Sequence, residues 1–313
     1  MLAVIRSSGE RTTELCQKLV LEEIPKDNTV IICEAPFTNA IKKTFELGIE
    51  RGLPWTLAID ADLLIRANAI KDLLQLAKQA DDKVFELQGL ILDKLFLAFR
   101  PGGGHLYRTS LLHRAIEQIP HEEVSGRPET TTLRNMESQG HPWILSDIIF
   151  GIHDYEQYYR DIYRKGFQHG KKHRRYIPYL EPLWQRLGKE DPDYLVASQG
   201  LSEGKNYEGP FNPDARDFKH RFKISLERFN LIEKENLSSE SMCSMDVTHI
   251  IELFELPTEH SELVKIRDNY GWERPSSWYK RVSAAIREKG PGWIFRRLIK
   301  KRETNLQKPE GID

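Results

Sequence analysis

Apolar, strand-like runs alternate with helix-like segments over the first eighty residues, and this alternation limits the possible folds more than any other feature. Strands are predicted at 2–5, 29–33 and 55–59, and amphipathic helices at about 12–24, 40–51 and 68–80. Strands that alternate with helices form a parallel sheet covered by helices. In such a sheet ligands bind at the carboxyl ends of the strands, where Arg6, Glu34 and Asp60 fall.

Strand-like and helix-like segments continue to about residue 150, and after it the pattern changes to helices and loops. A β-rich stretch, two helices and one more buried strand are predicted at 84–107, 110–119, 129–139 and 146–150. A basic helix, a loop-rich stretch, another helix, a serine-rich linker and a basic amphipathic segment follow at 154–175, 189–217, 219–236, 237–244 and 278–301. We therefore expect an α/β domain over 1–175 and a mainly helical region with loop-rich linkers over 176–313.

Composition excludes several classes of protein. The 313 residues carry 46 basic and 47 acidic side chains, so no overall positive charge attracts nucleic acid, and we expect no nucleic-acid partner. Three scattered cysteines give no disulfide framework, which favours a cytoplasmic chain. The longest apolar region, 84–99, is interrupted by Glu86, Asp93 and Lys94, so we do not expect it to span a membrane.

Two aspartates, Asp60 and Asp62, follow directly after the strand predicted at 55–59. As the chain leaves the strand, both carboxylates can reach the edge of the sheet. Carboxylate oxygens suit Mg²⁺ or Mn²⁺, which proteins often hold with few side chains together with substrate phosphates. Such a cation would neutralise the negative charge that builds up on a leaving diphosphate.

An ordered series of motifs over roughly residues 2–155 resembles that of nucleotide-sugar glycosyltransferases of the GT-A fold, especially the family-two-like group. The motifs are the strand and loop Val4–Thr12, Glu34, Asp60-Ala-Asp62, Gly103–Arg108, Glu129-Thr130, Leu133-Arg134, Gly140 and His153. The resemblance implies an α/β, Rossmann-like and mostly parallel sheet with helices on both faces, followed by a helical C-terminal extension. It also implies hexosyl transfer from a nucleotide-sugar donor, with inversion.

The same resemblance assigns the donor site. Contacts with the donor nucleotide are expected from Arg6, Ser7, Arg11, Glu34 and Asp60. The two arginines are suited to a diphosphate because guanidinium groups bind it bidentately.

The metal and the catalytic base follow from the later motifs. The resemblance places Mn²⁺ or Mg²⁺ on Asp60, Asp62 and His153. Glu129 is the predicted catalytic base, because an inverting enzyme needs a carboxylate beside the acceptor hydroxyl. Asp147 and Asp154 are its alternatives, since Thr130 replaces the second acid of the family's pair.

The resemblance implies an acceptor at the cell surface: a polysaccharide or other glycan, a glycolipid or a protein. The basic amphipathic segment Trp293–Arg302 could place the chain at the inner face of a membrane, or could pack on its own catalytic domain.

Two other functions stay open. A haloacid-dehalogenase-like phosphotransferase would use Asp60 as its nucleophile, although Leu63-Leu64 replaces the small or threonine residue expected there. An inactive nucleotide-sugar-binding module is compatible with Thr130.

Overall fold

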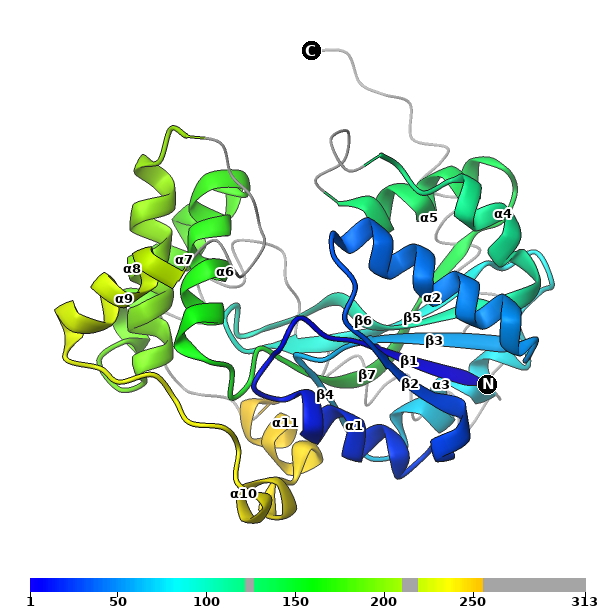
Figure 1. Cartoon of the computed structure of the whole chain (residues 1–313), viewed down its shortest axis with the longest axis horizontal. Helices are drawn as coiled ribbons and strands as arrows, with labels where there is room; N and C mark the ends of the chain where they lie inside the picture. Colours follow the sequence, from blue (N-terminus) through cyan, green and yellow to red (C-terminus); the bar gives the residue numbers. More distant parts are fainter. Residues whose placement is uncertain (122–126, 210–218, 256–313) are drawn as a thin grey trace.

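The computed structural model describes residues 1–121, 127–209 and 219–255 (Figure 1). Within these ranges the strands form one seven-stranded sheet in the order β2-β1-β3-β6-β5-β7-β4. The strands are β1 (Leu2–Arg6), β2 (Thr29–Ile32), β3 (Trp55–Asp60), β4 (Leu63–Ile65), β5 (Glu86–Asp93), β6 (Ala98–Arg108) and β7 (Trp143–His153).

Strands β6 and β4 run opposite to the other five, so the prediction of an α/β fold with a mostly parallel sheet is confirmed. The run at 63–65 was not predicted as a strand. Three residues are too few to show a period, and β4 forms only because it pairs with β7.

Helices cover both faces of the sheet (Figure 1). One face packs on α1 (Thr13–Leu21), α3 (Ala69–Ala77) and α11 (Val247–Glu255), and the other packs on α2 (Phe37–Arg51), α4 (Leu112–Glu117) and α5 (Pro128–Ser138). Short 3₁₀ helices occur at η1 (Lys26–Asn28), η2 (Thr109–Leu111) and η3 (Arg174–Tyr176). No helix of the described ranges is both long enough and apolar enough to cross a bilayer.

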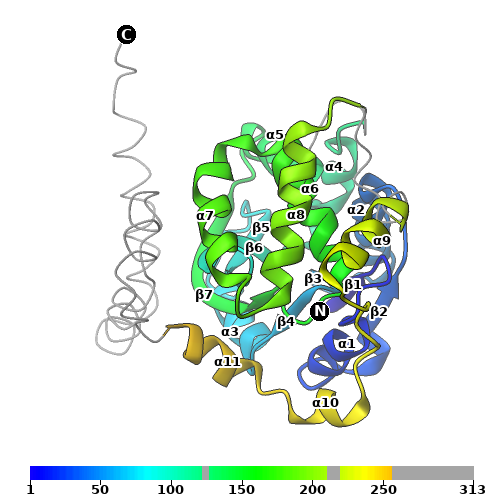
Figure 2. The same ribbon diagram turned by 90° about the vertical axis from the view of Figure 1, so that its left-hand side faces the viewer.

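A separate group of helices lies beside the sheet: α6 (Tyr159–Lys172), α7 (Ile177–Leu187), α8 (Pro192–Asn206) and α9 (Lys219–Phe229) (Figures 1 and 2). We call these four helices the helical group. Its apolar core is continuous with Leu95, Phe96 and Ala98, where β5 turns into β6.

The turn between β5 and β6 anchors the helical group to the sheet. Three successive carbonyl oxygens there accept hydrogen bonds from buried aromatic side chains of α7 and α8. Lys94 O accepts from Tyr194 at 2.9 Å, Leu95 O from Trp184 at 2.6 Å, and Phe96 O from Tyr179 at 2.5 Å. These bonds satisfy buried backbone acceptors that water cannot reach.

The prediction of a loop-rich stretch over 189–217 is wrong for α8. Asp191 caps this helix by accepting a hydrogen bond from the backbone N–H of Asp193 at 2.8 Å, and Pro192 occupies its first turn. The glycines that suggested a loop lie instead where α8 touches α6. A Cβ atom at Gly200 would lie 2.2 Å from Tyr163 O, and one at Gly204 2.2 Å from Phe167 O.

The predicted serine-rich linker at 237–244 is also partly helical. It contains α10 (Ser239–Ser244), because the Ser238 side chain accepts a hydrogen bond from Ser241 N and caps the helix. The basic amphipathic segment predicted at 278–301 lies outside the described residues.

The close contact of α6 and α8 predicts that Gly166→Ala destabilises the protein. A Cβ atom at Gly166 would lie 2.2 Å from Ala197 O, so the helices would have to separate. We expect the free energy of unfolding in urea to fall by about 1–3 kcal/mol. Ser202→Ala, at an exposed position of α8, is the control. Without the contact, alanine would stabilise the helix by up to about 1 kcal/mol, so a gain in stability contradicts this packing.

Candidate active site

A cleft of about 860 Å³ opens between the sheet and the helical group. Its lining comes from the ends of β1, β3, β5 and β7, from α5 and from α6. The cleft therefore lies at the carboxyl edge of the parallel strands, where this class of fold binds ligands.

Strand pairing brings distant residues together at this edge. His153 ends β7, and it lies opposite Leu63 of β4 on one side and Asp93 of β5 on the other. Asp62 directly precedes Leu63, so it reaches the same place. Asp154 follows in a left-handed conformation with φ 63°, and its N–H donates to Asp62 O at 3.1 Å. The register of three strands thus assembles one charged group.

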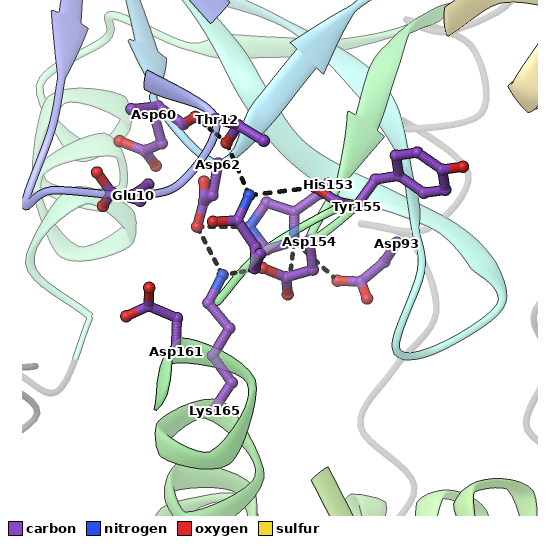
Figure 3. Close-up of polar contacts among 12 residues, drawn as sticks. Glu10, Thr12, Asp60, Asp62, Asp93, His153, Asp154, Tyr155, Asp161 and Lys165 are labelled. Atoms are coloured by element: carbon purple, nitrogen blue, oxygen red, sulfur yellow. Dashed lines mark hydrogen bonds and ion pairs between the residues drawn. The ribbon is translucent and has the colours of Figure 1, made fainter. Parts of the chain in front are cut away.

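Asp62, His153 and Asp154 could hold a metal ion, because one ligand atom from each lies within 4.8 Å of the others (Figure 3). His153 Nε2 lies 3.4 Å from Asp62 Oδ2, and His153 Nδ1 lies 3.1 Å from Asp154 Oδ2. The Oδ1 atom of Asp62 is buried and has no hydrogen-bond partner among the described residues.

Cationic side chains complete this charged group. Lys165 of α6 places its Nζ 2.6 Å from Asp62 Oδ2 and also donates to Asp154 Oδ1 (Figure 3). Arg100 donates from Nε to Asp93 Oδ2 at 2.6 Å, and His153 Nδ1 lies 3.3 Å from the same oxygen.

The pKa values within this group follow from its charge pairs. Burial alone would raise the pKa of Asp62, but Lys165 and His153 outweigh it and hold the pKa well below its ordinary value. Burial opposes the charge on His153, but Asp154 and Asp62 outweigh it and hold the imidazole pKa well above its ordinary value. The group is thus held together by opposite charges.

A second buried group surrounds Arg6 at the end of β1. Arg6 Nε donates to Asp60 Oδ1 at 2.7 Å, and Arg6 Nη1 donates to Glu129 Oε1 at 2.7 Å. Tyr107 donates its hydroxyl to the same Glu129 oxygen at 2.6 Å, and His105 Nε2 lies 3.2 Å from Glu129 Oε2. Glu129 therefore contacts three side chains, one at the end of β1 and two on β6.

For both Glu129 and His105, the charged partners shift the pKa in the direction opposite to burial. Burial would raise the pKa of Glu129, but Arg6 and His105 lower it to about 2. Burial would lower the pKa of His105, but Glu129 and Glu86 raise it to about 9. His105 is thus a cation at neutral pH.

The structure separates the residues predicted for the metal. Asp62 and His153 lie together, whereas Asp60 contacts Arg6 and contributes no atom to the three-residue ligand set. The ligand role of Asp60 stays a prediction. Asp154, which the sequence suggested only as an alternative base, completes the ligand set.

The predicted donor-contacting residues fall in two places. Ser7 and Glu34 line the cleft together with Arg6 and Asp60. Arg11 instead donates to Glu156 Oε2 at 2.5 Å and to Glu235 O at 2.5 Å. Asp147, the other alternative base, lies in the middle of β7.

Sequence reasoning assigned no site role to Asp93 or Lys165, and it included His105 only as part of the Gly103–Arg108 motif. Asp93 carries a recognisable signal, because it ends an apolar strand in the same way as Asp60. Lys165 carries none, since nothing local distinguishes it from the other residues of the surrounding basic segment.

No protein-family model and no curated protein matches the chain. Among the solved structures to which it is similar, two have low identity to it. One is a glycosyltransferase involved in the glycosylation of the major capsid of PBCV-1, with a TM-score of 0.34, 11% identity, and coverage of 46% of this chain and 80% of that one. The other is the mannosyltransferase PcManGT from Pyrobaculum calidifontis in complex with GDP-Man and Mn²⁺, with a TM-score of 0.36, 13% identity, and coverage of 82% and 87%.

We predict that Glu129→Gln destabilises the protein. The buried Arg6 guanidinium would lose one of its two carboxylates, which costs roughly 3 kcal/mol in a buried pair. Urea unfolding at pH 7 measures the loss. Glu46→Gln, which breaks an exposed pair with Lys42, should change stability by less than about 0.5 kcal/mol. Equal stability of wild type and Glu129→Gln would show that Glu129 does not support Arg6.

We also expect His105 to stay protonated up to about pH 9. The folded pKa exceeds the unfolded value of about 6.5, so its stabilising contribution is complete below pH 6.5 and lost as pH rises to about 9. The shift corresponds to roughly 3 kcal/mol. An NMR titration of the ring signals, assigned with His105→Gln, measures the pKa directly. A midpoint near 6.5 would refute the charge pairing with Glu129 and Glu86.

Proposed function

We propose that this chain transfers a sugar from a nucleotide-sugar donor, with a divalent cation held by Asp62, His153 and Asp154. The observation that carries the proposal is this ligand set at the carboxyl edge of the sheet, in a cleft of about 860 Å³. The motifs in the first 155 residues that resemble GT-A glycosyltransferases support the same reading.

The residues present fit a cation such as Mn²⁺ or Mg²⁺. Two carboxylates are suitable ligands for Mn²⁺ or Mg²⁺, and the imidazole adds a nitrogen ligand of the kind that transition metals accept. The other ring nitrogen of a metal-binding histidine usually donates to a carboxylate, a backbone carbonyl or water, and His153 Nδ1 has the carboxylates of Asp154 and Asp93 beside it. When bound, the cation would stabilise the negative charge of a leaving nucleoside diphosphate.

Arg6 supports binding of an anionic donor. It lines the cleft, it is 5% exposed, and its Nη2 atom has no hydrogen-bond partner among the described residues. A buried guanidinium with a free donor is suited to a phosphate oxygen or to a carbonyl oxygen of a nucleotide base. Its two carboxylate partners hold it in place for such a ligand.

The contacts of Glu129 favour a positioning role over that of the predicted base. Its carboxylate already accepts hydrogen bonds from Arg6 and Tyr107, and its pKa of about 2 makes it a weak base. We therefore propose that Glu129 holds Arg6 and His105 in the cleft. Catalysis by Glu129, and with it inversion, stays a prediction.

The geometry does not favour the phosphotransferase alternative. Its nucleophile would be Asp60 beside a metal ion, but Asp60 Oδ1 is held by Arg6 Nε at 2.7 Å. A cell-surface glycan, glycolipid or protein acceptor, a hexosyl donor and membrane contact through 293–302 remain proposals from the sequence.

The proposal predicts metal-dependent binding of one class of nucleotide sugar. We expect UDP-, GDP-, CMP- or dTDP-sugars to stabilise the wild type in the presence of Mn²⁺. A ligand at 100 times its Kd adds about 2.7 kcal/mol, which a thermal-shift assay detects and calorimetry can confirm. Asp62→Asn should lose this stabilisation, because it removes one carboxylate of the ligand set.

Asp82→Asn is the matched control, since the Asp82 side chain is fully exposed on the surface. It should respond like the wild type. If no nucleotide sugar stabilises the wild type, or if Asp62→Asn responds equally, the proposed donor site is wrong. Stabilisation without release of the nucleotide in the presence of acceptor mixtures would instead favour a binding module.

A further inference from the structure

Lys165 connects the helical group to the candidate metal ligands. Its Nζ contacts Asp62 Oδ2 at 2.6 Å and also contacts Asp154 Oδ1 (Figure 3). Two of the three side chains that could hold a metal ion are therefore already paired with a cation, and α6 supplies it.

We propose that Lys165 is the resident cation of this site and exchanges with a divalent metal ion. Its ammonium group leaves Asp62 and Asp154 when the metal binds them, and it then binds the diphosphate of the donor. The inference rests on the proposed function, because it concerns the same donor site.

Charge balance favours such an exchange. Three carboxylates, those of Asp62, Asp93 and Asp154, pair with the cationic side chains of Arg100 and Lys165, and Lys165 is the one that contacts both Asp62 and Asp154. These groups are mostly buried, and uncompensated charge is strongly unfavourable there. If Lys165 left without a replacement, Asp62 and Asp154 would lose their closest cation. A divalent cation bound to the same oxygens supplies two positive charges for these two carboxylates.

The position of Lys165 also allows it to move while α6 stays in place. The α6 backbone is fixed against α8 by glycine contacts, including Gly166 next to Lys165. The lysine side chain has four flexible methylene groups, so its ammonium group can turn without a shift of the helix. Lys165 lines the cleft, and an ammonium group released there faces the space where a diphosphate would bind.

Binding of MnCl₂ alone to the full chain tests the exchange. We expect Lys165→Met to bind Mn²⁺ at least ten-fold more tightly than the wild type in calorimetry, because the competing cation is gone. Lys205→Met is the control: Lys205 also lies in the helical group, but it pairs with Glu181 at 2.9 Å instead. It should bind Mn²⁺ like the wild type.

The outcomes separate this inference from the proposed function. Equal or weaker Mn²⁺ binding by Lys165→Met overturns the exchange, while nucleotide-sugar binding by the wild type still supports the donor site. If neither protein binds Mn²⁺, both the exchange and the proposed metal ligands are wrong. With Mn²⁺ saturating, inorganic pyrophosphate should bind Lys165→Met several-fold more weakly than the wild type. Equal affinity would overturn the contact between Lys165 and the diphosphate.

A second measurement needs no variant at this position, in case Lys165→Met does not fold. Acetylation of the wild type with acetic anhydride, read by mass spectrometry, reports how accessible each lysine amine is. We expect MnCl₂ to increase the labelling of Lys165 several-fold and to leave Lys205 unchanged. Unchanged labelling of Lys165 at saturating Mn²⁺ would overturn the exchange.

Discussion

The turn between β5 and β6 is the constraint on which the rest of the structure depends. Its carbonyl groups at Lys94, Leu95 and Phe96 are buried inside the helical group, where only protein donors can satisfy them. The three aromatic donors come from α7 and α8, so a shift of these helices that broke the bonds would leave buried acceptors unsatisfied. The turn thereby positions the helical group, which forms one wall of the cleft, relative to the sheet, which forms the other.

The turn also carries the ionic contacts that bring charge to the cleft. Lys94 is buried and pairs with Asp193 and with Asp191, the latter at 3.0 Å, at the start of α8. One residue earlier, Asp93 pairs with Arg100 and His153 inside the cleft. Adjacent residues thus serve two purposes: one fastens the helical group, and the other orients a candidate metal ligand. A buried ion pair adds little net stability, but the loss of one partner leaves the other as an uncompensated buried charge.

Much of the sheet could be predicted from the sequence, because the first three strands are apolar runs bounded by polar residues. Strands β1, β2 and β3 and helices α1, α2 and α3 all agree with the hydrophobic pattern. Strand β4 and helix α8 could not be predicted in this way. Strand β4 depends on pairing with β7, and α8 contains glycines whose role appears only when α6 is beside it.

The same distinction applies to the site. Asp62 and His153 could be proposed because each ends or follows a recognisable strand, and the structure brings their side chains together. Lys165 could not be proposed, because it is one of many basic residues in the segment 154–175. Lys165 and Asp62 are 103 residues apart in the chain, and their contact depends on the position of α6 relative to the sheet. Long-range ion pairs of this kind leave no local pattern.

The glycine contacts between α6 and α8 bear on how sequence variation in this protein should be interpreted. Cβ atoms at Gly166, Gly170, Gly200 and Gly204 would each lie within 2.4 Å of a backbone oxygen of the facing helix. Relatives that keep this arrangement must retain glycine at all four positions, whatever donor or acceptor they use. Invariant glycine at these four positions would therefore reflect the close packing of two helices. Differences in substrate preference would instead be expected among the residues that line the cleft.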